Sequence, residues 1–290
     1  MTPPALRTFP LPIQFRQKVP SGPDFFRVTG ALKDSRLKTV CEEAKCPNRT
    51  ECYARGTLTF QILGDVCTRR CGFCAEATGR PAPPDPDEPE KLLEAAKKLG
   101  LRHAVITAPA RDDVPDGGAA AFARCVRILK DGIPGISVEV LTSDLLGREE
   151  SLRTVLESRP DVFNHNLETV RRLTPRVRGR ATYNGSVRVL RFAAGTAGTV
   201  RIKSGIMVGL GETWTEIEEA LADLRSAGVS CLTAGQYLRP STEHLPIEKF
   251  YSREDFARVR SIAESLGFEK VFAGALVRSS YRAGEMIGHV

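Results

Sequence analysis

Three cysteines within eight residues are the part of the sequence best suited to chemistry. Cys67, Cys71 and Cys74 have the spacing C-x3-C-x2-C and directly follow a strand-like run at residues 57–64. Three thiolates on one short loop can hold three corners of a metal centre and leave the fourth without a protein ligand. An open coordination position is typical of a catalytic metal site rather than a structural one.

Two kinds of metal centre fit this loop. Iron–sulfur clusters are held by cysteine thiolates, whereas short Cys-Cys spacings also occur in zinc knuckles. The position of the loop after the first strand of a strand–helix series favours the catalytic centre, because active sites of such barrels lie at the carboxyl ends of the strands. Arg69 and Arg70 are expected to help keep the thiolates ionised.

A second set of three cysteines lies upstream. Cys41, Cys46 and Cys52 have the spacing C-x4-C-x5-C, so they again supply three thiolates with the fourth position unassigned. The two remaining cysteines, Cys125 and Cys231, fall inside a predicted apolar helix and strand. We expect them to be small core residues.

Strands and helices alternate along most of the chain. Strands are predicted at residues 57–64, 103–107, 136–141, 161–165, 200–207 and 230–236. Helices are predicted at residues 90–99, 117–129, 148–157, 187–194, 213–227 and 252–266, and Thr213 and Glu216 suggest a capping box. Such alternation implies parallel strands with right-handed crossovers. The predicted fold class is α/β, a partial, open (β/α)6 TIM-like barrel.

Extensions are expected at both ends of this barrel. We assign residues 1–56 to an N-terminal extension, 57–240 to the barrel and 241–290 to a C-terminal helix and segment, all in one unit. The proline-rich residues 1–30 are expected to form an extended arm. A short helix is predicted from about Ser35 to Lys45, ended by Pro47.

Composition excludes some classes of function. The chain has 290 residues, a formal net charge of +7 and 41% hydrophobic residues, without an apolar run long enough to span a bilayer or a signal peptide core. We expect a cytoplasmic protein, in which clustered cysteines bind metal rather than form disulfides. No basic run is interleaved with aromatics, so we expect neither a nucleic acid nor a membrane as partner.

The first cysteine loop resembles the signature of radical S-adenosylmethionine enzymes, with the aromatic Phe73 directly before the last cysteine. In that superfamily the free iron of a four-iron, four-sulfur cluster binds the amino and carboxylate groups of S-adenosylmethionine. An electron from the cluster then cleaves the cofactor to a 5′-deoxyadenosyl radical. The resemblance gives Cys67, Cys71 and Cys74 a catalytic role.

Both cysteine sets together resemble one family, the lipoyl synthases. Further segments resemble it in the expected order, at residues 111–118, 138–144, 163–169, 203–213, 232–237 and 278–281. The resemblance implies a second four-iron, four-sulfur cluster that donates sulfur. A serine of Arg-Ser-Ser-Tyr would be its fourth ligand, here Ser280, with Ser279 as the alternative. Residues 108–111 and Arg171 depart from the usual family sequence.

The resemblance also implies the reaction and its partners. Two sulfur atoms are inserted at carbons 6 and 8 of an octanoyl chain on a lysine of a lipoyl carrier domain. Carriers would be 2-oxoacid dehydrogenase acyltransferase subunits and the glycine cleavage carrier protein, and the electron donor a flavodoxin or ferredoxin. Because such carriers are usually acidic, docking is expected to use basic side chains. The arginines proposed for docking are Arg171, Arg172, Arg176 and Arg178.

Other predicted cofactor contacts lie after strands. Asn166 and Glu168 follow a strand at the barrel mouth, where a ribose could be held. Gly209, Gly211 and Glu212 form a strand-to-helix turn that could approach the cofactor, although an ordinary turn explains them equally well. His165 is expected to be a core or rim histidine, because hydrogen abstraction by a radical needs no base.

Two other classes of protein remain as alternatives. A methylthiotransferase-type sulfur inserter also carries two clusters, but its auxiliary cysteines are typically much farther apart than Cys41 and Cys52. A non-catalytic iron–sulfur carrier or a zinc-stabilised binding module would not need six strand–helix units around a cavity.

Overall fold

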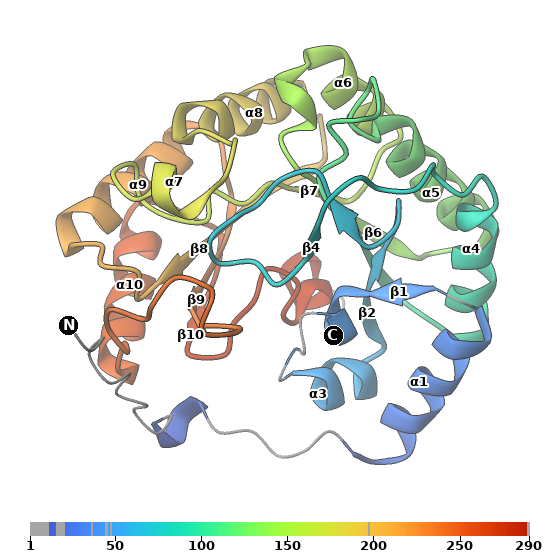
Figure 1. Cartoon of the computed structure of the whole chain (residues 1–290), viewed down its shortest axis with the longest axis horizontal. Coiled ribbons are helices and arrows are strands. Elements are labelled where there is room, and N and C mark those ends of the chain that lie inside the picture. Colours follow the sequence, from blue (N-terminus) through green and yellow to red (C-terminus); the bar gives the residue numbers. More distant parts are fainter. Residues whose placement is uncertain are drawn as a thin grey trace, which may run out of the picture.

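A sheet of eight strands forms the centre of the protein (Figure 1), in a computed structural model that describes residues 12–15, 21–35, 37–43, 46, 48–196 and 198–288. The strand order is β1-β2-β5-β6-β7-β8-β9-β10, and all neighbours are parallel except the antiparallel pair β1 and β2. The strands are β1 Lys38–Thr39, β2 Thr57–Gln61, β5 His103–Thr107, β6 Ser137–Leu141, β7 Val162–Asn164, β8 Arg201–Val208, β9 Cys231–Gln236 and β10 Lys270–Gly274. A separate short sheet pairs β3 Val66–Cys67 with β4 Ala77–Thr78.

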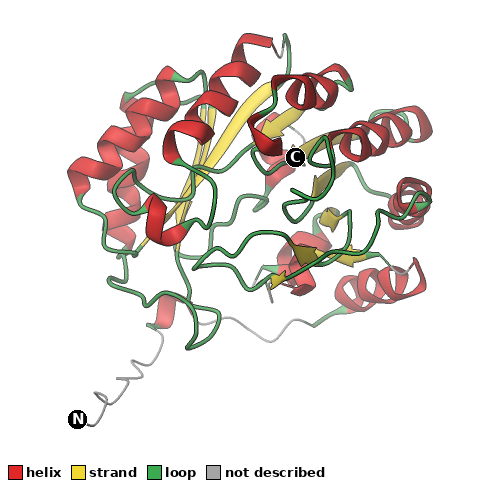
Figure 2. Cartoon of the chain, turned by 45° about the horizontal axis from the view of Figure 1, so that its top comes forward, coloured by secondary structure: helices red, strands yellow, loops and turns green. Residues whose placement is uncertain are grey.

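Helices form an outer layer around the curved sheet (Figures 1 and 2). The helices between the strands are α4 Glu88–Leu99, α5 Ala119–Gly132, α6 Glu149–Glu157, α7 Thr174–Val177, α8 Tyr183–Thr196, α9 Trp214–Ser226 and α10 Arg253–Ser265. The N-terminal part contributes α1 Pro23–Ser35, α2 Val40–Glu43 and α3 Arg49–Ala54. Short 3₁₀ segments are η1 Ile13–Phe15, η2 Leu145–Gly147 and η3 Ala283–Ile287. Apolar faces of the long helices pack on the sheet and close one core.

The six predicted strands are confirmed as β2, β5, β6, β7, β8 and β9, and the sheet continues with a parallel β10 that was not predicted. This last strand lies at the edge of the sheet, and four of its five residues are only partly buried. Within the described residues β1 and β10 do not pair with each other, which leaves the barrel open as predicted. The sheet also crosses the expected boundaries at residues 56 and 240, because β1 and β10 belong to it.

The N-terminal expectations need correction. Residues 23–30 were expected to be extended, but they belong to α1, which starts at Pro23, where proline lacks only an amide that a helix leaves unpaired. Val28, Ala31 and Leu32 lie three and four residues apart and are buried against the core. The predicted helix at 35–45 is replaced by β1 and the short α2, and residues 1–11, 16–20, 36, 44, 45 and Pro47 lie outside the described residues.

Helix starts follow the predicted capping chemistry. Thr213 and Glu216 form a reciprocal capping box at the start of α9, and Ser252 and Asp255 form another at the start of α10. In each box a side chain accepts a hydrogen bond from an amide that the first helical turn leaves free. No helix in the described ranges has the length and apolarity that a bilayer crossing requires.

The C-terminal segment lies inside the curve of the sheet. Figure 1 shows the C-terminal end beside α3 and β2, far in sequence from both. Asn48 Nδ2 donates to the carbonyl of Leu276 at 2.7 Å, and Arg55 at the end of α3 pairs with Glu285 at 2.8 Å. The N-terminal part around α3 and the C-terminal segment therefore meet in the gap that the open barrel leaves.

Candidate functional site

The first cysteine loop leaves the carboxyl end of β2, where the sequence predicted it. Cys67 lies on β3 and pairs in register with Thr78 of β4, so a short ladder closes the base of the loop. Cys74 N donates to the carbonyl of Cys71 at 3.2 Å, which forms a tight turn between these two cysteines. The loop therefore has its own internal structure rather than depending on a metal for its path.

Neighbouring loops hold the cysteine loop from the outside. Gly72 donates through its amide to Val177 O and accepts at its carbonyl from Leu245 N, both at 2.9 Å. A Cβ on Gly72 would lie 2.9 Å from the side chain of Leu245, and one on Gly179 would lie 2.4 Å from the carbonyl of Arg70. At Gly179 a side chain would require the backbone at Arg70 to shift, whereas at Gly72 the Leu245 side chain would have to move.

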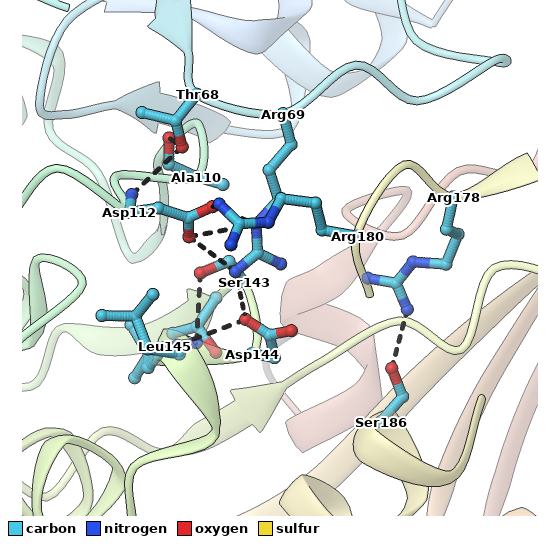
Figure 3. Close-up of polar contacts among 12 residues, drawn as sticks. Thr68, Arg69, Ala110, Asp112, Ser143, Asp144, Leu145, Arg178, Arg180 and Ser186 are labelled. Carbon is cyan, nitrogen blue, oxygen red and sulfur yellow. Dashed lines mark hydrogen bonds and ion pairs between the residues drawn. The ribbon is translucent and has the colours of Figure 1, made fainter. Parts of the chain in front are cut away.

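Arg69 ties the cysteine loop to the next two strands (Figure 3). Its guanidinium bonds both carboxylate oxygens of Asp112, the shortest contact being 2.7 Å, and Asp144 Oδ1 at 2.6 Å. The three side chains are 8%, 9% and 16% exposed. Burial alone would raise the pKa of Asp144, but the hydrogen bond and charge of Arg69 lower it. The charge of Arg69 is thus neutralised by carboxylates and is not directed at the thiols, contrary to the sequence-based expectation.

Arg178, which the sequence had placed among the docking arginines, acts on a thiol of the first loop. Its Nη1 donates to Asn166 O at 3.0 Å. The same Nη1 donates to Ser186 Oγ at 2.7 Å (Figure 3). Its charge lowers the pKa of Cys71, against the larger opposite effect of burial. The signal for this role is its position: it precedes Gly179, whose close approach to Arg70 places it next to the cysteine loop.

Most thiols of the two cysteine sets have a raised pKa in the folded chain. Burial raises the pKa of Cys41 to about 11 and those of Cys52 and Cys74 to about 12, and it also raises those of Cys46 and Cys71. All six cysteines are free. A bound cation can ionise such thiols, since metal coordination removes the proton outright. In the described ranges no three His, Cys, Asp or Glu side chains are placed to hold a single metal ion.

The second cysteine set lies against the C-terminal Arg-Ser-Ser-Tyr segment. Asn48, between Cys46 and Cys52, bonds the carbonyl of Leu276. Tyr281 donates its hydroxyl to the carboxylate of Glu51 at 3.1 and 3.2 Å. The charge of Arg278 lowers the pKa of Cys46, again against the larger effect of burial. Residues on both sides of the serine pair therefore face the second cysteine set.

The two serines have different surroundings. Ser279 Oγ accepts a hydrogen bond from Asn166 Nδ2 at 2.6 Å. The Ser280 hydroxyl makes no hydrogen bond with another residue in the part of the chain that the structure describes. Both side chains are half-buried. The geometry thus gives Ser279 a partner and leaves Ser280 available, and its role as an iron ligand stays a prediction.

Asn166 and Glu168 lie at the carboxyl end of β7, as the sequence predicted. Glu168 has the left-handed backbone angle φ 71°, and its amide and carbonyl bond Gly205 and Met207 of β8 at 3.0 and 2.8 Å. Burial raises the pKa of its carboxyl, although Arg178 and Asn166 oppose the rise. Backbone strain at a strand end is typical of functional positions. Both side chains are held at the mouth of the barrel.

The turn at Gly209–Glu212 is closed by its own side chain. The Glu212 carboxylate accepts from the amides of Gly209 and Leu210 at 2.5 and 2.9 Å. Gly209 has φ 104°, and a Cβ there would lie 2.1 Å from Gln236 Nε2, so the turn needs glycine for its packing. These contacts favour the ordinary strand-to-helix turn, and the cofactor role of Gly209, Gly211 and Glu212 stays a prediction.

Several predicted core residues are confirmed. Cys125 and Cys231 are fully buried, in α5 and β9. His165 is 1% exposed and bonds Thr142 O at 3.0 Å and Ser186 Oγ at 2.9 Å through its two ring nitrogens. Burial, and then the charge of Arg178, lowers its pKa to about 4.

Phe73, which the sequence placed among the cofactor contacts, is partly buried and packs against the core. Its contact with a cofactor stays a prediction.

The other predicted docking arginines lie on the surface and each has an acidic partner. Arg171 pairs with Asp223 at 3.1 Å, Arg172 with Glu216 at 2.7 Å and Arg176 with Glu248 at 3.7 Å. Side chains of these arginines are more than half exposed. Exposed pairs exchange partners at little cost, so a role in docking stays a prediction for these three.

A cavity of about 480 Å³ opens beside the Arg69 network. It lies between the carboxyl-end loops of β5 and β6 and the starts of α6 and α8. Its charged lining residues are Arg69, Asp112, Asp144, Glu149, Arg180 and Arg188. The six cysteines of the two sets are not among its lining residues, but Arg69 of the first cysteine loop is, so the cavity adjoins that loop.

The comparisons with known proteins agree with this geometry. The radical SAM superfamily matches residues 62–224. A lipoyl synthase of Rubrobacter xylanophilus is 50% identical over 270 residues, which is 93% of this chain and 84% of the relative. Lipoyl synthases of Halalkalibacterium halodurans and Thermus thermophilus are 52% and 49% identical, over 88% and 94% of this chain and 85% of each relative.

Solved structures support the fold. Methylornithine synthase aligns with a TM-score of 0.54 at 16% identity, over 73% of this chain and 70% of its own. HydG, a maturase of the [FeFe]-hydrogenase, aligns with a TM-score of 0.56 at 13% identity, over 91% of this chain and 75% of its own. At such identities the likeness concerns the barrel alone.

Proposed function

Because this chain belongs to the lipoyl synthase family of radical S-adenosylmethionine enzymes, we propose that it inserts two sulfur atoms into a protein-bound octanoyl chain. The sulfurs enter at carbons 6 and 8 of an octanoyl-lysine and give the lipoyl group. The observation that carries the proposal is that the second cysteine set lies against the Arg-Ser-Ser-Tyr segment, through Asn48–Leu276 and Glu51–Tyr281. This contact brings the second cysteine set next to the serines that the family resemblance gives as the fourth ligand of a sulfur-donating cluster.

Two sets of residues fit two clusters. Cys67, Cys71 and Cys74 would hold a four-iron, four-sulfur cluster with one iron free for S-adenosylmethionine. A second cluster, on Cys41, Cys46, Cys52 and Ser280, would be the sulfur donor. Free thiols whose pKa burial raises form a soft donor set, which suits iron–sulfur clusters. An oxygen ligand is weaker than a thiolate and suits an iron that must leave when sulfur is given up.

The bound cofactor and clusters supply the radical that removes hydrogen and the sulfur that replaces it, because no side-chain acid or base can attack an unactivated C–H bond. The chain's own residues position these groups and exclude water. Asn166 and Glu168 would hold the ribose at the end of β7, and Phe73, which packs against the core beside the cysteine loop in sequence, would be a further cofactor contact. The turn of Gly209, Gly211 and Glu212 would form one wall of the cofactor site.

The partners follow from the same family. We propose octanoylated carrier domains as substrates, those of 2-oxoacid dehydrogenase acyltransferase subunits and the glycine cleavage carrier protein. A flavodoxin or ferredoxin is the proposed electron donor, and the cytoplasm the proposed compartment. The formal net charge of +7 favours encounter with an acidic carrier. Arg171, Arg172 and Arg176 are the exposed basic side chains proposed for this surface.

Anaerobic reconstitution tests the proposal. The full chain is loaded with iron and sulfide, its metals are measured, and 5′-deoxyadenosine is followed with an octanoylated carrier under reducing conditions. We expect about eight irons per chain, the number for two four-iron clusters, and formation of the lipoyl group. Zinc in place of iron, or no deoxyadenosine with any carrier, would refute the proposed function.

A further inference from the structure

The side-chain amide of Asn166 lies between the barrel mouth and the C-terminal segment. Its Nδ2 donates to Glu168 Oε1 at 3.1 Å and to Ser279 Oγ at 2.6 Å, across 113 residues of sequence. Both N–H groups of the amide are therefore used, one within the mouth and one on the terminal segment. Among the described residues, the second bond joins residues 276–282 to the carboxyl-end loops of the strands.

The terminal segment also contacts the N-terminal part of the chain and the barrel. Leu276, Tyr281 and Glu285 bond Asn48, Glu51 and Arg55 respectively. On the barrel side, the Val277 amide donates to Gly274 O of β10 at 3.1 Å, and the Val277 carbonyl lies against Gly235 of β9. These contacts hold the backbone of the segment, whereas the Asn166–Ser279 bond fixes a serine side chain in its middle.

The surroundings of Asn166 restrict where its amide can lie. A Cβ on Gly205 of β8 would lie 2.8 Å from Asn166 Oδ1, so glycine at this position leaves room for the amide. Asn166 Oδ1 is itself buried and has no hydrogen-bond partner in the described part of the chain. A buried oxygen without a hydrogen-bond partner lowers the stability of the fold. Such groups in native proteins often belong to functional sites.

We propose that Asn166 is a positioning residue that fixes the serine pair: it anchors Ser279 and thereby leaves Ser280 as the oxygen ligand of the second cluster. The role of Ser280 as a cluster ligand rests on the proposed function, whereas the anchoring of Ser279 by Asn166 does not. The Asn166 bond holds the Ser279 oxygen beside the barrel mouth. The Ser280 hydroxyl has no hydrogen-bond partner among the described residues, so it is free to turn toward the second cysteine set.

Hydrogen exchange of the cluster-free, full-length protein tests the anchoring without any activity. Asn166→Ala and Ser279→Ala should each speed exchange in residues 276–286 about fivefold, the size expected for one lost hydrogen bond. The double variant should be no faster than either single variant, because both remove the same bond. Ser280→Ala should leave exchange unchanged. Peptides covering β5, His103–Thr107, report global unfolding and serve as the internal reference.

Iron retention then separates the two serines. After reconstitution and challenge with a chelator, Ser280→Ala should lose about half of its iron, whereas Ser279→Ala should lose iron more slowly. Unchanged exchange in Ser279→Ala, or loss of the second cluster from Ser279→Ala but not from Ser280→Ala, would overturn the inference. If the wild-type protein binds no second cluster, the proposed function is refuted. The hydrogen-exchange rates of the variants still decide whether Asn166 anchors Ser279.

Discussion

Cys67, Cys71 and Cys74 share one loop that the barrel itself closes, whereas Cys41, Cys46 and Cys52 share their site with a segment 228 residues away along the chain. The first loop has short-range contacts of its own between β3 and β4, and loops that follow later strands brace it from outside. The second site exists only once the N-terminal part around α3 has met the C-terminal segment. Closing a long loop costs more entropy than closing a short one. The second site therefore depends more strongly on the complete fold than the first site does.

The difference matches what each site must do in the proposed reaction. A cluster that delivers electrons repeatedly needs a loop whose backbone does not change, and the glycines at 72 and 179 pack it tightly. A cluster that gives up sulfur must be opened and rebuilt. A site formed by two chain segments can open at the terminal segment without disturbing the barrel.

The largest expected effect separates the two sites by their chemistry. Cys74→Ala should abolish both cofactor cleavage and product, because the first cluster is lost. Cys41→Ala should abolish sulfur insertion while some 5′-deoxyadenosine still forms, with iron falling from about eight to about four per chain. Deoxyadenosine and iron measured side by side check this, and loss of cleavage in Cys41→Ala would contradict the division of labour.

The next effect concerns the stability of the first site. Arg69→Gln leaves Asp112 and Asp144 buried without their cation, which should lower the free energy of unfolding by about 3 kcal/mol. Arg180 pairs with the same Asp112 at 3.2 Å but is 69% exposed, so Arg180→Gln should cost at most about 0.5 kcal/mol. Denaturant unfolding checks both. Equal losses in the two variants would mean that the buried pairing does not hold the loop.

Acid should weaken the first site through His165. Its folded pKa of about 4 lies below the unfolded value of about 6.5, so the unfolded chain binds the proton first and stability falls as pH drops from 6.5 to 4. The full difference corresponds to about 3 kcal/mol. The measurement is the free energy of unfolding of the wild type minus that of His165→Gln, followed across this pH range. The described residues near the second site contain no histidine, so acid-induced exchange between pH 6.5 and 5 should begin around residue 165.

The smallest expected effects lie at the junction of the chain ends. Asn48→Ala removes a buried donor to Leu276 O and should cost about 1.5 kcal/mol, seen first as faster exchange in residues 276–286. Tyr281→Phe removes a bond to Glu51, whose side chain is 41% exposed, and should cost at most about 0.5 kcal/mol. If Asn48→Ala instead destabilised the first cysteine loop, the two sites would not be separate structural units.

The sequence by itself determined the barrel strands, both cysteine sets and the capping boxes at Thr213 and Ser252. These depend on local periodicity, spacing and first-turn chemistry, which are written in consecutive residues. It missed α1 from Pro23, because proline density hides a helix whose stability comes from packing Val28 and Leu32 on the core. Sequence reasoning also missed β10, because this edge strand forms by pairing with β9, a neighbour that the tertiary structure supplies.

Tertiary structure decided which charges act on which site. Arg69 is next to the cysteines in sequence yet is neutralised by Asp112 and Asp144, while Arg178 is distant in sequence and lies beside Cys71. It also gave Ser279 and Ser280 different surroundings, through Asn166. Ion pairs and hydrogen bonds between loops depend on where the strands bring their ends together. Neighbours along the chain therefore cannot predict them.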